Sequence, residues 1–345
     1  MSANPSLAER IRTTIRQDVA SMHGYAIQPS AGLVKLDAME NPFTLPPELQ
    51  HALGERLGRV AINRYPAQGA RVAEALAAFA KLPAGCRLML GNGSDELIDL
   101  LSVACNVPGA TVLAPLPGFV MYEMSARLRG LNFVGVPLTP RFELDEAAML
   151  AAVERHRPAI TYIAYPNNPT ANLFDDAIVQ RIVAAVGAQQ GLVVFDEAYQ
   201  PFASRTWMPR LPEWPHVLVM RTLSKFGLAG VRLGYLCGAA ALIDEIDKVR
   251  PPYNVSALNA ECALFALEHA DEYARQAALL RSERQRLLAA LQALPAAEPF
   301  PSEANMILVR VPDAKAAFEG MKARGVLVKN VSALHPLLEI GRAHV

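Results

Sequence analysis

Short apolar runs and amphipathic segments alternate along the middle of the chain. Most of the apolar runs lack the apolar–polar alternation of a half-solvated strand, which is typical of strands buried on both faces of a parallel sheet. The runs are residues 87–90, 111–114, 132–136, 160–164, 192–195, 217–221 and 232–237. Between them, residues 95–106, 119–129, 145–155 and 175–186 carry apolar residues at helical spacing. Strands and helices in alternation predict an α/β fold with a doubly wound, mainly parallel sheet and helices on both faces.

The C-terminal part of the chain has a different pattern. Residues 260–294 are rich in Ala, Leu, Glu and Arg, and they predict two helices, the second of them long. After a break at 295–301, we expect a strand at 305–309, a helix at 314–324 and another strand at 326–329. This arrangement predicts a second, smaller α+β domain.

These patterns divide the chain into four parts. Residues 1–45 begin with a helical pattern, include an extended piece, and are expected to form an N-terminal arm and part of the small domain. Residues 46–250 form the predicted large α/β domain, and residues 251–338 form the predicted small α+β domain. The last part of the chain is residues 339–345.

The composition is that of a globular protein. Of the 345 residues, 52% are hydrophobic, and 33 Lys and Arg balance 33 Asp and Glu, which argues against a surface made for nucleic acid. The arginines between 281 and 286 are interpreted as the solvated face of the long helix. The longest apolar stretch is interrupted by charge and prolines, so we expect no membrane span and no signal peptide. The four scattered cysteines have no metal-ligand spacing, which predicts a cytoplasmic protein without a metal site.

Two loops after predicted strands carry groups suited to a phosphate and to a polar ligand. GNGSDE (residues 91–96) is a Gly-rich turn that leads into a helix, and free N–H groups at a helix start suit a phosphate, although Gly-Ser-Asp is also an ordinary N-cap. YPNNPT (residues 165–170) presents amide side chains at the carboxyl edge of the sheet, where open α/β folds bind ligands. Asn-Pro is also a common turn signal.

Two further loops carry a buried acid and a single amine. In VVFDEAY (residues 193–199) an apolar strand ends at Asp196, whose carboxylate is costly to bury unless it meets a cation or a protonated ring nitrogen. Lys225 lies between an apolar strand and a Gly-rich segment, where desolvation can lower the pKa of an amine and make it a nucleophile. The four loops together supply what pyridoxal phosphate needs, with Lys225 as the amine that binds it covalently and Asp196 as the partner of its ring nitrogen.

Several longer signatures lie in one order across residues 33–330. They are NRYP (63–66), GNGSDE (91–96), YPNNPT (165–170), VFDEAY (194–199), RTLSK (221–225), GVRLGY (230–235) and PSEAN (301–305). With these signatures the chain resembles the fold-type I pyridoxal-phosphate aminotransferases and, within them, the histidinol-phosphate aminotransferases.

The resemblance implies a role for each matching residue. Lys225 would hold the cofactor and transfer a proton to and from the substrate, and Asp196 would pair with the pyridinium nitrogen. The other implied cofactor contacts are Asn168 and Tyr199 at the ring 3-oxygen, Ser94, Asp95, Ser224 and Arg232 at the phosphate, Phe119 stacked on the ring, and Tyr65 from the neighbouring subunit of a homodimer. Tyr25, in the arm, and Arg310 are the implied substrate-binding residues.

The chain departs from the family pattern at four places. The segment from Lys225 to Arg232 is one residue shorter than the commonest spacing in the family. Phe119 stands where the family usually has a tyrosine, which keeps the stacking and removes a phenol hydrogen bond. Met39, in the segment LDAMENP, replaces a polar residue. In the family, the pattern should continue past residue 338 into another strand. Here residues 339–345 can instead be back-translated into a common sequencing adapter. We therefore expect that this tail is not native and that the small domain is truncated.

The function implied is transfer of an amino group from L-histidinol phosphate to 2-oxoglutarate in L-histidine biosynthesis. Two alternatives use the same scaffold, an aromatic amino-acid aminotransferase and a threonine-phosphate decarboxylase. A third alternative, of another class, is a non-catalytic module that binds an effector. The partners expected are a small amino donor, a 2-oxo acid acceptor and a second copy of the chain.

Overall fold

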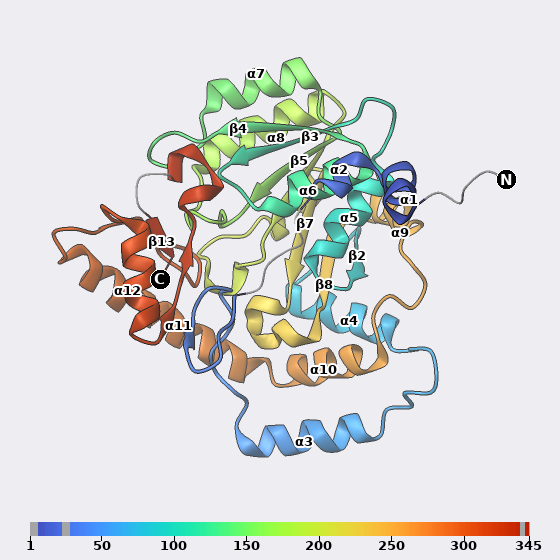
Figure 1. The fold of residues 1–345 in the computed structure, drawn as a ribbon. Helices are drawn as coiled ribbons and strands as arrows, with labels where there is room; N and C mark the ends of the chain where they lie inside the picture. Colours follow the sequence, from blue (N-terminus) through green and yellow to red (C-terminus); the bar gives the residue numbers. More distant parts are fainter. Residues whose placement is uncertain (1–5, 23–27, 339–341, 345) are drawn as a thin grey trace.

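A seven-stranded sheet forms the centre of the computed structural model, which describes residues 6–22, 28–338 and 342–344 (Figure 1). Its strand order is β2-β8-β7-β6-β5-β3-β4, and all neighbours are parallel except that β8 is antiparallel to β2 and β7. The strands are β2 (Cys86–Gly91), β3 (Thr111–Leu116), β4 (Asn132–Pro137), β5 (Ile160–Ala164), β6 (Leu192–Asp196), β7 (Val217–Thr222) and β8 (Gly234–Ala239). The predicted mainly parallel α/β sheet is confirmed.

Both faces of this sheet are buried. Successive residues of β6 point to different hydrophobic cores, since Val193 and Phe195 lie in one and Val194 lies in the other. Helices α5 (Ser94–Ala104), α6 (Val120–Arg129) and α9 (Ala240–Asp247) pack on one core, and α4 (Gly69–Ala80), α7 (Glu146–His156) and α8 (Asp176–Ala188) pack on the other. This double coverage explains why the strands carry no apolar–polar alternation.

The C-terminal region adds two helices and small sheets. The expected helix pair is confirmed as α10 (Ala257–Glu268) and α11 (Ala270–Gln292), and a helix follows at α12 (Ala314–Ala323). A four-stranded antiparallel sheet has the order β12-β13-β10-β9, and β1 pairs in parallel with β11. These strands are β1 (Val34–Lys35), β9 (Glu298–Pro299), β10 (Leu308–Arg310), β11 (Val326–Leu327), β12 (Lys329–Asn330) and β13 (Arg342–His344).

Two details of this region differ from the sequence prediction or go beyond it. The single strand expected at 326–329 is divided, because β11 pairs with β1 whereas β12 pairs with β13. Of residues 339–345, the structure describes 342–344, which form β13. The non-native origin of this tail and the domain boundaries at residues 45 and 250 stay predictions.

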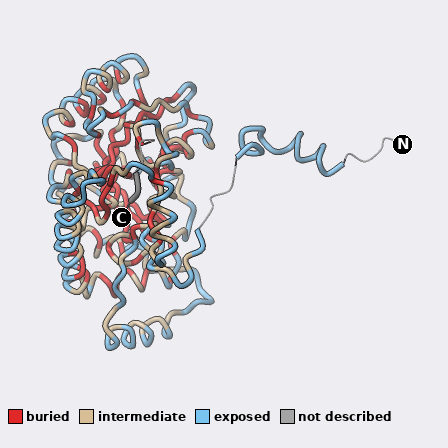
Figure 2. The backbone as a smooth tube through the Cα atoms, turned by 60° about the vertical axis from the view of Figure 1, so that its left-hand side comes forward, coloured by how far each residue is buried: buried red, intermediate tan, exposed pale blue. Residues whose placement is uncertain are grey.

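The N-terminal helices lie outside this body. Figure 2 shows the buried residues gathered in the interior, while α1 (Leu7–Thr14) stands away from it with every residue exposed. The short α2 (Gln17–Ala20) follows, and α3 (Pro47–Gly58) runs beside α10 at one end of the molecule (Figure 1). No helix within the described ranges is long and apolar enough to cross a membrane.

Candidate active site

The predicted cofactor-binding loops meet at one edge of the central sheet. Strands β5, β6 and β7 are parallel neighbours, so the segments that follow them open at the same edge. Strand β2 runs in the same direction, because two antiparallel pairings relate it to β7, and α5 therefore also starts at this edge. The Tyr165 N–H donates to the Asp196 carbonyl at 2.8 Å, which joins the loop after β5 to the end of β6.

Asp196 ends β6 as a buried carboxylate with two fixed donors. The Tyr122 hydroxyl donates to Oδ2 at 2.7 Å, and the Ala198 N–H donates to Oδ1 at 3.1 Å. Burial raises the pKa of Asp196 to about 6, against the lowering effect of both hydrogen bonds. A carboxylate held in this way is suited to a protonated ring nitrogen, which would supply the missing positive charge.

Lys225 lies on a π-helical turn, η3 (Ser224–Leu228), directly after β7. Its Nζ donates to the Ala38 carbonyl at 2.7 Å and lies 5.9 Å from the centre of the Tyr199 ring. Burial lowers the pKa of the Lys225 amine to about 8. A considerable fraction of this amine is therefore neutral near physiological pH and able to attack an aldehyde.

Arg232 and the start of α5 form a cradle for an anion. The guanidinium lies 3.2 Å from Asp95 Oδ2, and it donates to the Ser224 hydroxyl at 3.5 Å. Gly93, the N-cap of α5, has a φ of +88°, and a Cβ there would lie only 2.8 Å from Arg232 Nη2. Gly85 offers a contrast, because it has a φ of +78° but nothing within 4 Å of the position that a Cβ would take. The close approach of Gly93 and the free N–H groups of α5 fit a phosphate group.

The remaining predicted ring contacts lie beside Asp196. Asn168 Nδ2 donates to the Tyr199 hydroxyl at 3.3 Å, and burial raises the pKa of that buried phenol. The Phe119 ring meets the Tyr122 ring edge-on at 5.6 Å. A cavity of about 80 Å³ next to Phe119 and Tyr122 also contacts Pro169, in the loop after β5. The donors and rings present here fit the polar and flat parts of pyridoxal phosphate.

Three predicted residues are not brought into this group. Tyr65 is 76% exposed and stacks on Tyr253, with 4.5 Å between the ring centres. Arg310, in β10, forms an ion pair with Glu298 and lies over the Phe300 ring at 5.1 Å. Tyr25 lies outside the described residues. The roles of all three stay predictions.

Other residues at the site carry no signal in the local sequence. Thr222 shares a 2.9 Å hydrogen bond with the Ser224 hydroxyl, and the charge of Lys329 adds to burial in lowering the pKa of Lys225. Tyr122 belongs to an ordinary amphipathic helix, and nothing in its spacing indicates a contact with Asp196. The contacts of Lys329 and Tyr122 join parts of the chain that are distant in sequence, so only the fold shows them.

The interpretation of the arginines at 281–286 as a solvated face is wrong for Arg284. Its Nη1 donates to the Ala304 carbonyl at 2.8 Å and to the Phe202 carbonyl at 3.3 Å, and Arg281 donates to the Pro201 carbonyl at 2.7 Å. Two of these bonds attach α11 to the 3₁₀ turn η1 (Gln200–Phe202), which follows Tyr199, and the third attaches it to the segment before β10. The long side chain of Arg reaches across the helix face, which helical spacing alone does not predict.

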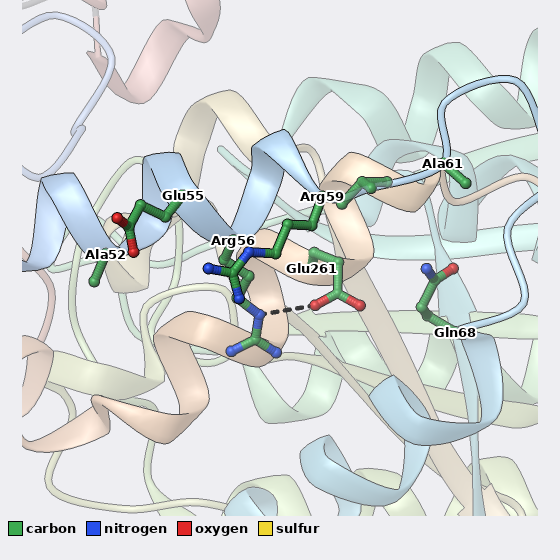
Figure 3. A pocket seen from close by; sticks show the side chains of 8 residues that line it. Ala52, Glu55, Arg56, Arg59, Ala61, Gln68 and Glu261 are labelled. Carbon is green, nitrogen blue, oxygen red and sulfur yellow. Dashed lines mark hydrogen bonds and ion pairs between the residues drawn. The ribbon is translucent and has the colours of Figure 1, made fainter.

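A separate open pocket of about 580 Å³ lies between α3 and α10 (Figure 3). Arg56 Nε donates to Glu261 Oε2 across it at 2.8 Å. None of the cofactor-binding residues predicted above lines this pocket. The described part of the chain also holds no group of three or more His, Cys, Asp or Glu side chains that could bind a metal ion.

Comparisons with known proteins agree with this geometry. Residues 31–340 match the family described as aminotransferase class I and II. Histidinol-phosphate aminotransferase of Methylibium petroleiphilum is 73% identical over 340 residues, covering 98% of this chain and 91% of the relative. The corresponding protein of Paracidovorax citrulli is 67% identical over 336 residues, with coverages of 94% and 90%.

A solved structure shows the same fold. Histidinol-phosphate aminotransferase from Sinorhizobium meliloti, in complex with pyridoxal-5′-phosphate, superimposes with a TM-score of 0.82 at 24% identity, covering 96% of this chain and 92% of that one. This likeness confirms the predicted fold-type I architecture, and the family match and the two close relatives confirm the resemblance seen in the sequence. The chain therefore belongs to the class I and II aminotransferases and, within them, to the histidinol-phosphate aminotransferase family.

Proposed function

We propose that the protein transfers the amino group of L-histidinol phosphate to 2-oxoglutarate, giving imidazole acetol phosphate and glutamate, in L-histidine biosynthesis. The observation that carries this proposal is the convergence of Lys225, Asp196 and Arg232 at one sheet edge in a chain 73% identical to a relative of that name. The presence of Asn168 and Tyr199 beside these three residues favours a catalyst over an effector-binding module, because the whole set of residues expected for the chemistry is retained.

Each residue of the site would have a separate role toward the cofactor or the substrate. Bound pyridoxal phosphate supplies a ring that takes up the electrons left when the substrate's α-carbon loses a proton. Arg232, Ser224 and the start of α5 would bind the phosphate, and Asn168 and Tyr199 would face the ring 3-oxygen. Asp196 would keep a proton on the ring nitrogen, and the Lys225 amine would take the α-proton and return it.

A half-reaction tests this function and its rivals. The protein is purified with pyridoxal phosphate, and histidinol phosphate is added without an acceptor. We expect the absorbance of bound pyridoxal phosphate to convert to that of the pyridoxamine form, faster than with phenylalanine, and 2-oxoglutarate to reverse the change. Lys225→Ala should abolish the conversion, because no other amine replaces its proton transfer.

The other outcomes identify the alternatives. Faster conversion with phenylalanine would indicate an aromatic aminotransferase, and release of carbon dioxide from threonine phosphate would indicate a decarboxylase. A chain that binds the cofactor and converts none of these substrates would be a binding module. Each of these results contradicts the proposed transamination of histidinol phosphate.

We further propose that the protein is a cytoplasmic homodimer in which Tyr65 reaches the cofactor phosphate of the partner subunit. Support comes from the exposure of Tyr65 and from its stacking on the exposed Tyr253, which leaves an aromatic pair on the surface. The four cysteines are free, as expected of a reducing compartment.

Mixed dimers test the shared site. Tyr65→Ala and Lys225→Ala subunits should each have low activity alone. A mixed dimer contains one site with both Lys225 and the partner's tyrosine intact, so mixing after mild denaturation should restore up to half of the activity per dimer. If mixing restores nothing although mixed dimers form, Tyr65 does not act across the interface.

A further inference from the structure

Tyr122 joins the acid of the site to its aromatic surroundings. It lies in α6, is 2% exposed, and donates from its hydroxyl to Asp196 Oδ2 at 2.7 Å. Its ring stacks on Tyr162 with 4.3 Å between centres and 2° between planes. The same ring meets Phe119 edge-on at 84°. The stacking and the edge contact together fix the direction in which the hydroxyl points.

The two donors to Asp196 differ in kind. The Ala198 N–H belongs to the backbone that continues from β6. Any residue except proline at position 198 would provide the same donor. The Tyr122 hydroxyl comes from a different element and depends on that side chain alone. Burial and the nearby Asp196 charge raise the pKa of Tyr122 well above its ordinary value, so the phenol keeps its proton and remains a donor.

We propose that Tyr122 is a positioning residue, whose hydroxyl holds the Asp196 carboxylate ionised and oriented so that the cofactor's ring nitrogen keeps its proton. The inference rests on the proposed function, which places that nitrogen at Asp196. One proton is shared between the ring nitrogen and the carboxyl group. A donor to the carboxylate stabilises the arrangement in which the proton is on the nitrogen, because a hydrogen bond to a charged oxygen is stronger than one to a neutral carboxyl.

Other groups around Asp196 act on the same equilibrium without donating to it. Negative charges nearby favour a protonated carboxyl group, which opposes the effect of Tyr122. The negative charges of Asp95 and Glu197 act in this way. The phenols of Tyr162 and Tyr199 also lie nearby, but burial raises their pKa, so they keep their protons and carry no charge. Tyr122 therefore offsets an environment that would otherwise move the proton to the carboxyl group.

The test observes the ring nitrogen directly. Holoenzyme is prepared with pyridoxal phosphate labelled with ¹⁵N in the ring, and the ¹⁵N chemical shift is recorded without any amino donor. In Tyr122→Phe, we expect the ratio of protonated to unprotonated nitrogen to fall by about ten- to a hundredfold, which corresponds to the loss of one hydrogen bond to a charged group. The rate of the half-reaction should fall with it, while KM for the amino donor changes little.

Tyr162→Phe is the matched control. It removes a hydroxyl from the other ring of the same buried stack, and that hydroxyl does not donate to Asp196. Its ¹⁵N signal should equal that of the unmodified holoenzyme. An unchanged signal in Tyr122→Phe, or an equal change in both variants, would overturn the proposal, since either result means that the hydroxyl of Tyr122 does not control the proton.

A second variant covers the case in which Tyr122→Phe does not fold or loses the cofactor. With 3-fluorotyrosine at position 122, the shape is nearly unchanged and the phenol is a stronger donor, so the protonated fraction should rise. A fall or no rise overturns the proposal. Because no amino donor is present, these signals are the same whichever substrate the enzyme uses, so a failed substrate assignment cannot be mistaken for a failure of this inference.

Discussion

Replacing Arg221 by methionine is expected to lower the free energy of unfolding by about 3–5 kcal/mol. Arg221, on β7, and Glu197, after β6, form an ion pair whose side chains are 8% and 0% exposed. Arg221 Nε donates to Glu197 Oε2 at 2.9 Å, and Nη2 donates to the Thr206 hydroxyl at the same distance. Methionine would leave the Glu197 carboxylate buried without its counter-charge, which is the costly half of breaking such a pair.

Denaturant unfolding of the cofactor-free protein measures this change. The matched control is Arg286→Met, because Arg286 pairs with Glu283 on the surface, where the side chains are 74% and 58% exposed. That change should cost less than about 1 kcal/mol. Adding Glu197→Leu to Arg221→Met should recover part of the loss, since no unpaired charge then remains. Equal losses in Arg221→Met and Arg286→Met would show that burial does not set the strength of the pair.

The central sheet was predictable because its strands are buried on both faces. A short apolar run such as residues 160–164, bounded by turn residues, predicts a strand buried on both faces. The structure places β5 at Ile160–Ala164. The helices between the strands follow from their apolar spacing and from capping residues such as Asp145 and Asp175, whose side chains accept from the first turn of α7 and α8.

Small strands of the C-terminal region were less predictable. The run at 326–329 carries no signal for its division, because β11 finds its partner in β1, almost 300 residues earlier, and β12 finds its partner in β13. The short strand β9 was not predicted, since its two residues lie within the break at 295–301, which is rich in proline and alanine. Pairing partners of this kind depend on the whole fold and not on local sequence.

Site residues were predictable where an ionisable side chain stands at the end of an apolar strand. Asp196 and Lys225 each follow an apolar strand, and both have the burial and the shifted pKa that this position implies. The contacts that hold them were not predictable. Ala38 binds the Lys225 amine through a backbone carbonyl, which any residue offers, and Tyr122 reaches Asp196 from another element. Residue types mark the chemistry of the site, whereas only the fold shows what orients it.

Replacing Asp196 by asparagine is expected to abolish transamination and yet to stabilise the cofactor-free protein at pH 7. Burial raises the pKa of Asp196 from 3.8 to about 6, so the folded protein binds this proton more tightly than the unfolded chain does. The ionised carboxylate therefore lowers the free energy of unfolding. This loss is absent below pH 4, grows as the pH rises from 4 to 6, and is complete above pH 6. Its full value is about 3 kcal/mol.

Asparagine avoids the cost of the charge and keeps a hydrogen bond to each of the two neighbours of Asp196. Its Oδ1 can accept from the Ala198 N–H, and the Tyr122 hydroxyl, which donates to Asp196, can accept from Nδ2 instead. Unfolding at pH 7 should therefore require more denaturant in Asp196→Asn than in the unmodified protein, by up to about 3 kcal/mol. At pH 4 the two proteins should be nearly equal. The neutral amide gives no charge to hold a proton on the ring nitrogen, so the half-reaction should fail.

The control for this pH dependence is Glu319→Gln, on the exposed face of α12, which should leave stability nearly unchanged from pH 4 to pH 7. A loss of stability in Asp196→Asn at pH 7 would contradict the prediction, because it would mean that the buried carboxylate stabilises the fold through its hydrogen bonds. The expected gain means that the acid is retained at a cost to the fold, which bound cofactor offsets by supplying the positive charge that Asp196 lacks.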